Sequence, residues 1–368
     1  MFYQGQELQL LHAILTVNYV AFRMGPEVLK AMQEASDNQV AEVIFDSTYR
    51  CNANCYYCDI PKVALPLHKG RQEITAIDIK QMLKSKYFKN LFRFSISGGE
   101  PTLRGDLKEL LALALEKAKC ASVVTNGLLP EKMEEALSGI DVSRLGLAIS
   151  LDAIGEKQDE MMNVPGAFSR IKQTLEMASK FDLGWREISF TITPERFDEI
   201  LKVDELACQY GAFVYAEFAR PAYRYKYSDR QLSWIDDALR RLRQPFTQLP
   251  RKLNRAIVES IRLEMDNCVR QLKYSLKFFE HTGGRKWFVL NPYGEIYPCW
   301  PCRDFCVWNP ETQSLGNPRY RFGNIKEEDF DQIWESETAN RIREEISSDG
   351  HIHQNWTECM NLSYFVPR

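Results

Sequence analysis

The sequence predicts an α/β protein built on parallel strands, followed by a smaller region near the C-terminus. From residue 42 to residue 218 the apolar pattern switches repeatedly between a period of two and a period of 3.6. Strands that alternate with helices in this way imply parallel βα units with right-handed crossovers. With 45% apolar and 26% charged residues among 368, the chain has the composition of an ordinary globular protein with a large core.

The elements follow in a regular order after an N-terminal helical segment, residues 1–40. Six strands are predicted, at 42–49, 91–97, 121–125, 144–150, 186–192 and 212–218. Helices are predicted between and after them, at 74–87, 104–118, 130–138, 166–180 and 195–210. Residues 222–285 break this rhythm with predicted helices at 229–243 and 252–280, so we expect a helical insertion after a strand-and-helix domain at 41–221.

Charge and hydropathy exclude several classes of protein. The net charge of −3 argues against a nucleic-acid-binding surface. Residues 220–229 interleave basic and aromatic side chains, a pattern also used for base stacking, but we favour a loop over the mouth of the domain. The first residues lack a basic stretch followed by a clean apolar run, so no signal peptide is apparent. No apolar run reaches the roughly 18–20 residues of a membrane span. We therefore expect a soluble, cytoplasmic protein.

The N-terminal helix predicted from residue 7 is apolar on more than one face. The simpler interpretation is a helix that packs on the wall of the domain. The alternative is an interfacial helix that contacts a membrane and gives access to a lipid substrate. Its single basic residue, Arg23, weakens this alternative.

Three cysteines with spacings of four and three follow the first predicted strand: Cys51, Cys55 and Cys58. Three thiolates in a short loop can hold three irons of a [4Fe–4S] cube, which leaves the fourth iron without a protein ligand. An open metal position is typical of a catalytic metal site. A zinc site is the alternative, but it needs a fourth ligand, and the next candidate is His68. The loop also falls at the carboxyl end of a strand, where active sites of such barrels lie.

This motif resembles the signature of the radical S-adenosylmethionine (SAM) superfamily. The resemblance implies a partial (β/α)6 TIM-like barrel in which SAM chelates the open iron. It also implies that an electron from the cluster splits SAM into methionine and a 5′-deoxyadenosyl radical. Cys51, Cys55 and Cys58 are then both the metal ligands and the catalytic centre.

The resemblance also implies cofactor-binding residues at the ends of the later strands. Paired glycines let a backbone approach a ligand closely, and the Gly98-Gly99-Glu100 turn corresponds to the family motif that contacts the methionyl ammonium of SAM. Asn126 lies in a turn that is either part of the active site or only a polar turn, and Asp152 is either near the cofactor or a helix N-cap. The complete expected set is Tyr57, Gly98, Gly99, Glu100, Asn126, Ser150 (to the SAM ribose), Asp152 and Thr191.

A second group of cysteines follows a predicted β-hairpin at 287–299 that turns at 292–294. The hairpin, the Gly323-Asn324-Ile325 step and a terminal cysteine resemble the SPASM/twitch extension of radical SAM enzymes, here at 286–368. Such extensions bind auxiliary [4Fe–4S] clusters, and the number of cysteines favours one. The expected ligands are Cys299, Cys302, Cys306 and Cys359, with Cys268 as the alternative and a zinc site as the competing interpretation.

The function expected from these features is that of a radical SAM oxidoreductase or transferase-type enzyme. It would abstract a hydrogen atom from a small-molecule or lipid substrate, with the auxiliary cluster relaying an electron and a flavodoxin or ferredoxin as donor. The alternative is a maturase that forms thioether or carbon–carbon links in a ribosomal peptide. It is less favoured because only about forty residues precede the first strand, where a leader-binding domain is often found. A non-catalytic iron–sulfur electron carrier is a third interpretation.

Overall fold

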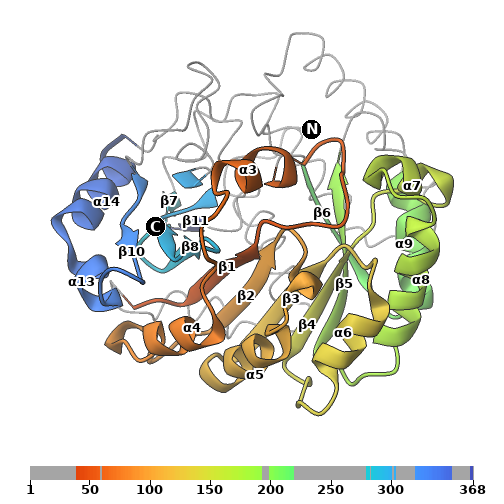
Figure 1. Ribbon diagram of the computed structural model, residues 1–368, viewed down its shortest axis with the longest axis horizontal. Helices are drawn as coiled ribbons and strands as arrows, with labels where there is room; N and C mark the ends of the chain where they lie inside the picture. Colours follow the sequence, from red (N-terminus) through yellow and green to blue (C-terminus); the bar gives the residue numbers. More distant parts are fainter. Residues whose placement is uncertain are drawn as a thin grey trace, which may run out of the picture.

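The computed structural model describes residues 39–58, 60–192, 199–218, 279–281, 283–300, 302–303, 320–349 and 365–367. Its main feature is one twisted sheet of nine strands in the order β10-β9-β8-β1-β2-β3-β4-β5-β6, which curves into an open barrel (Figure 1). Strands β1 to β6 are parallel to one another. The predicted α/β partial barrel is therefore confirmed.

The six barrel strands lie where the sequence places them, with ends that differ by one or two residues. They are β1 (Glu42–Thr48), β2 (Arg93–Gly98), β3 (Cys120–Thr125), β4 (Leu145–Ser150), β5 (Trp185–Ile192) and β6 (Phe213–Phe218). The helices of the barrel are α4 (Ala76–Met82), α5 (Leu107–Lys117), α6 (Pro130–Leu137), α7 (Glu156–Met162), α8 (Ala167–Ala178) and α9 (Ile200–Gln209). The sequence did not predict α7. It also did not predict the short turns η1 (Ile60–Ala64) and α3 (Leu65–Leu67) after the cysteine loop.

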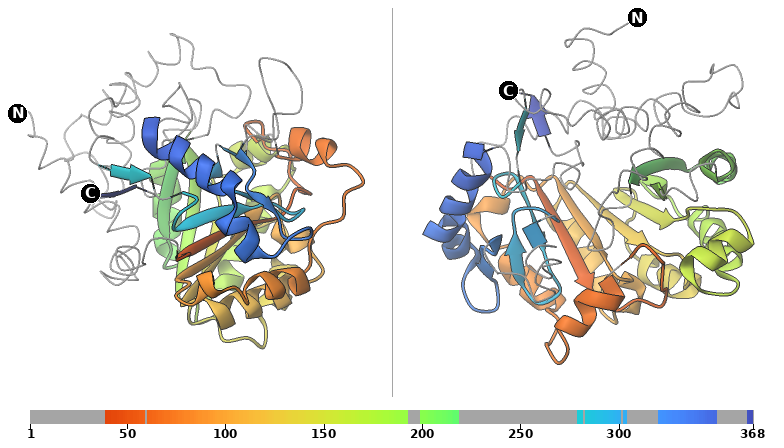
Figure 2. Two further views of the ribbon diagram at one scale, coloured as in Figure 1. Left: turned by 90° about the vertical axis from the view of Figure 1, so that its left-hand side faces the viewer. Right: turned by 90° about the horizontal axis from the view of Figure 1, so that it is seen from above.

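The core lies between the sheet and the helices on its outer face (Figure 2). Strand β2 illustrates why the period of two is so clear in the sequence. Phe94 and Ile96 are fully buried against the helices, whereas Arg93, Ser95 and Ser97 alternate with them and are half-buried on the other face. The inner face of the barrel is therefore polar along this strand.

The C-terminal region continues the barrel sheet instead of standing apart from it. Strand β8 (Trp287–Leu290) pairs in parallel with β1, and β9 (Glu295–Tyr297) and β10 (Gly323–Asn324) follow it with antiparallel pairing. The hairpin turn predicted at 292–294 is confirmed, with Gly294 at φ +90°. Helices α13 (Phe330–Glu335) and α14 (Glu337–Asp349) pack against it at the left of Figure 1.

One predicted helix is wrong at its C-terminal end. Residues 279 and 280 close the helix predicted at 252–280, but they belong to β7 (Phe279–His281), which pairs with β11 (Phe365–Pro367). A partner strand about 85 residues away decides the conformation there, and a local pattern does not reveal it. The N-terminal helix and most of the insertion lie outside the described residues. None of the described helices has the length and apolar character needed to cross a bilayer.

Candidate active site and auxiliary cysteine site

The cysteine loop begins where β1 ends, and the paired glycines after β2 hold its first residues. A Cβ atom on Gly98, at φ +120°, would lie 2.5 Å from the carbonyl oxygen of Thr48. On Gly99 it would lie 2.2 Å from that of Arg50. The Gly99 amide donates to Thr48 (2.6 Å) and the Glu100 amide to Arg50 (2.8 Å). The glycines thus fix the entry of the loop, and their contact with SAM stays a prediction.

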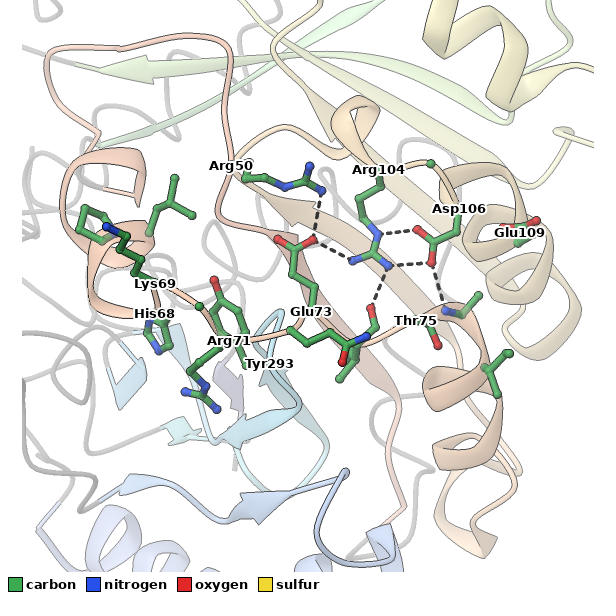
Figure 3. Close-up of a pocket in the computed structure, with 18 residues that line it drawn as sticks. Arg50, His68, Lys69, Arg71, Glu73, Thr75, Arg104, Asp106, Glu109 and Tyr293 are labelled. Carbon is green, nitrogen blue, oxygen red and sulfur yellow. Dashed lines mark hydrogen bonds and ion pairs between the residues drawn. The ribbon is translucent and has the colours of Figure 1, made fainter.

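A polar network supports the same loop entry from behind, along a groove of about 1160 Å³ (Figure 3). Buried Arg104 donates to the carbonyl oxygen of Ser47 (2.6 Å) and lies 3.7 Å from Glu73, which also pairs with Arg50 (3.2 Å). Arg104 packs over the ring of Phe45, on the face of β1 that carries the helices. This groove is therefore behind the active-site face of the strand.

The three loop cysteines are half-buried and lie in one electrostatic neighbourhood. Burial raises the pKa of Cys55 strongly, and the nearby Cys58, Asp152 and Cys51 raise it further. Burial also raises the pKa of Cys51. The positive charge of bound iron reverses this penalty, because a coordinating thiol is deprotonated by its metal.

The three half-buried thiols of the loop suit a cluster, because a cube spreads three thiolates over three iron atoms.

Asn126 reaches the cysteine loop directly. Its side-chain amide donates to Asn52 Oδ1 (2.7 Å) and lies 3.6 Å from Cys51 Sγ, a weak hydrogen bond of the kind that tunes cluster potentials. Glu100, fully buried, holds the Asn126 turn in place by accepting from the Asn126 amide (2.7 Å) and from Thr125 Oγ1 (2.8 Å). This turn therefore contacts the cysteine loop, and the contact of Asn126 with a cofactor stays a prediction.

Asp152, Tyr57 and Thr191 come together, although they lie far apart in the sequence. The Tyr57 hydroxyl donates to Asp152 Oδ2 (2.8 Å), and the Thr191 amide donates to Asp152 Oδ1. Burial and then the Asp152 carboxylate raise the pKa of Tyr57 well above its usual range, so the phenol keeps its proton. Asp152 does not cap α7, whose N-cap is Gly155. Ser150 ends β4 and is half-buried, and its contact with a ribose stays a prediction.

The auxiliary cysteine site is described in part. Cys299 and Cys302 are buried, with their sulfur atoms 3.3 Å apart. The Arg303 amide donates to the Cys299 carbonyl oxygen (3.1 Å), so Cys299, Trp300, Cys302 and Arg303 lie on one helical turn. Two buried thiols on one turn suit a cluster or a metal. The remaining expected ligands, Cys306, Cys359 and the alternative Cys268, lie outside the described residues, so the ligand set stays a prediction.

One pair of functional residues was not found from the sequence. Asp46 on β1 and Arg303 on the auxiliary turn form a buried ion pair, 257 residues apart in the chain. A carboxylate directly after the apolar run Val43-Ile44-Phe45 was the sequence signal that a partner was needed.

Together these features define an iron–sulfur protein of the α/β barrel class, with a cysteine loop at a strand end and a second cysteine site on the same sheet. The sequence profile of the radical SAM superfamily matches residues 46–206, and that of the iron–sulfur cluster-binding SPASM domain matches residues 282–361. The chain belongs to the radical SAM superfamily and carries a SPASM domain. These domains bind [4Fe–4S] clusters and SAM.

Several proteins are similar over most of the chain. An AdoMet-dependent heme synthase of Methanosarcina barkeri is 25% identical over 84% of this chain and 86% of its own length. The mycofactocin maturase MftC of Mycolicibacterium smegmatis is 23% identical over 93% of this chain and 83% of its own. The crystal structure of Streptococcus suis SuiB bound to its precursor peptide SuiA has a TM-score of 0.58 at 16% identity, covering 88% of this chain and 72% of that one. At 16% identity, the comparison with SuiB supports the fold alone.

Proposed function

We propose that this protein is an enzyme that cleaves SAM reductively at a [4Fe–4S] cluster held by Cys51, Cys55 and Cys58. With SAM bound, the reduced cluster would supply the electron that splits SAM into methionine and a 5′-deoxyadenosyl radical, and this radical would abstract a hydrogen atom from the substrate. The observation that carries the proposal is the convergence of Asn126 and Asp152 on the cysteine loop. Their strands end at the same edge of the sheet.

The residues around the loop hold the cysteines, orient the Asp152 carboxylate and shield the site from water. Asn126 holds the first cysteine in place, and the neutral Tyr57 hydroxyl fixes the Asp152 carboxylate. Asp152 lies next to Cys55 and so offers its carboxylate beside the place where a cofactor sits. The loop backbone is tied to the end of α7 by the Asn54 amide, which donates to Met162 (2.9 Å) and helps to close the site to water.

The auxiliary site would hold one [4Fe–4S] cluster on Cys299 and Cys302, with Cys306 and Cys359 or alternatively Cys268. We propose that it relays an electron from the product radical; direct ligation of the substrate is the second option. A flavodoxin or ferredoxin in the cytoplasm would reduce the SAM-binding cluster.

For the substrate, the polar residues on the inner face of the barrel favour a polar small molecule. Glu42, Arg93 and Ser95 form hydrogen bonds toward the amino end of this face (2.6 and 3.3 Å), and Asp46 and Ser97 continue it toward the cysteine loop. The argument for a lipid substrate depends on the predicted N-terminal helix, which lies outside the described residues. A peptide is the second candidate, since MftC is described as a maturase and SuiB was solved with a precursor peptide.

The test is an anaerobic assay of the reconstituted full-length protein with SAM and dithionite. We expect 5′-deoxyadenosine to form, and Cys55→Ala to abolish it. The matched control is Cys208→Ala, since Cys208 is exposed on α9. A wild-type protein with a full iron content that leaves SAM intact would contradict the proposal and favour the electron carrier.

The substrate class can be tested in the same assay. An extract is divided into a dialysable fraction and a retained peptide fraction, and each is added to the enzyme. Faster 5′-deoxyadenosine formation with the dialysable fraction supports a small molecule. Stimulation by the retained fraction alone supports a peptide.

A further inference from the structure

The ion pair between Asp46 and Arg303 is buried on both sides. Asp46 is 2% exposed and Arg303 is 7% exposed. Arg303 Nη1 donates directly to Asp46 Oδ2. Two charges removed from water in this way are stable only while each neutralises the other.

The pair lies on the inner face of the barrel. Asp46 is in register with Ser97 of β2, and paired residues of adjacent strands point to the same face. The preceding residue, Phe45, points to the opposite face and contacts Phe94 in the helix-covered core. Arg303 therefore reaches from the auxiliary turn into the same polar interior that the cysteine loop borders.

The pair also joins the two cysteine sites through short stretches of chain. Arg303 follows Cys302 directly, and Asp46 lies five residues before Cys51. The turn at 299–303 has a second contact, between the rings of Trp300 and Trp287 on β8 (centroids 6.1 Å apart), but that contact is apolar and less directional. We propose that Asp46 and Arg303 are positioning residues that hold the auxiliary cysteine turn against β1, and so fix the auxiliary cluster relative to the SAM-binding loop. This inference rests on the proposed function.

The loss of Arg303 leaves the buried Asp46 carboxylate without its ion-pair partner, and the loss of Asp46 removes the direct hydrogen bond that holds Arg303 against β1. In both cases the turn is the part that can move. The opening of a local segment exposes its thiols in proportion to the equilibrium between closed and open forms. From the usual penalty for breaking a buried pair, we expect the open form of the turn to gain about 100-fold or more. The hydrophobic core of the barrel should stay intact in both variants, so the opening should be confined to the turn.

The first experiment labels the metal-free full-length protein with N-ethylmaleimide and follows each cysteine by mass spectrometry. In Asp46→Asn and Arg303→Gln, Cys299 and Cys302 should react about 100-fold faster than in the wild type, with Cys120 on β3 unchanged. The matched control is Glu42→Gln, which breaks another ion pair, between buried Glu42 and half-buried Arg93, on the same face of the same strand. It should leave the labelling of the auxiliary turn unchanged.

The second experiment reconstitutes the clusters under anaerobic conditions. In Asp46→Asn we expect the iron content and the electron paramagnetic resonance signal of the auxiliary cluster to be lost, while 5′-deoxyadenosine still forms with dithionite. Arg303→Lys keeps the positive charge, so it should retain part of the auxiliary signal that Arg303→Gln loses. If wild-type protein fails to cleave SAM, the proposed function fails, but the labelling result still decides on the positioning role.

The inference is overturned if both variants label their auxiliary thiols within twofold of the wild type. It is equally overturned if Glu42→Gln accelerates the labelling as much as Asp46→Asn does, since the effect would then be a general loss of stability.

Discussion

A methyl group added at Gly99 should displace the entry of the cysteine loop. In Gly99→Ala the new Cβ would lie 2.2 Å from the carbonyl oxygen of Arg50 and 3.0 Å from the carbonyl carbon of Tyr49. Backbone atoms cannot rotate away as a side chain does, so the loop and β2 must separate by roughly 1 Å. That movement breaks the two short hydrogen bonds from Gly99 and Glu100 to the loop.

The cost follows from these contacts. Overpacking costs about 1–3 kcal/mol, and weakening the two backbone hydrogen bonds adds about 1 kcal/mol or more. A total of about 2–4 kcal/mol corresponds to at least about a 30-fold loss in the population of the correctly formed loop. We expect iron retention at the SAM-binding cluster and the rate of 5′-deoxyadenosine formation to fall by at least this factor.

The assay compares Gly99→Ala with Gly105→Ala, six residues along the chain. A Cβ on Gly105 meets nothing within 4 Å, so this control should behave as the wild type. Circular dichroism checks that both variants keep their secondary structure. A Gly99→Ala protein that holds its cluster and cleaves SAM within twofold of the wild type would refute the steric argument.

Two further predictions concern a tyrosine of the candidate site and a buried carboxylate on α9. Tyr57→Phe removes a hydrogen bond of 2.8 Å to a carboxylate and should slow SAM cleavage about tenfold, without loss of iron; an unchanged rate would show that the hydroxyl is not needed. Burial raises the pKa of Asp204 on α9 from 3.8 to about 6, so the folded state holds a proton that the unfolded state releases, and stability falls as pH rises through that window. Asp204→Asn should therefore raise the free energy of unfolding by about 1–3 kcal/mol at pH 8 and by little at pH 4, measured by urea denaturation; an equal gain at both pH values would contradict this reasoning.

The barrel could be predicted from the sequence because its strands and helices carry their own patterns. β2 alternates buried Phe94 and Ile96 with polar neighbours, and β4 is buried almost throughout, as a central parallel strand should be. Helix α7 was missed because its only apolar residues, Met161 and Met162, are adjacent and so show no helical period. The parallel pairing of β8 with β1 was also missed, since no local pattern reports which strand a distant segment will join.

The candidate site was predicted as a set of residue types at strand ends, and the structure supplies the contacts among them. Asn126 and Asp152 were expected near the cofactor, and both lie beside the cysteine loop. The structure adds that Glu100 supports the Asn126 turn, a role that its place in a motif does not reveal. The Asp46–Arg303 pair could not be predicted, because a long-range ion pair has no spacing rule.

The pairing of β8 with β1 also determines how this chain can be divided. A barrel cut away from its C-terminal region would expose the backbone of β1 along Glu42–Phe45, where Trp287–Leu290 now forms the ladder. Unpaired, flat strand edges recruit other chains and promote aggregation. The SPASM domain therefore covers this edge of the radical SAM barrel, and a shortened chain should keep Trp287–Leu290 if it is to stay monodisperse.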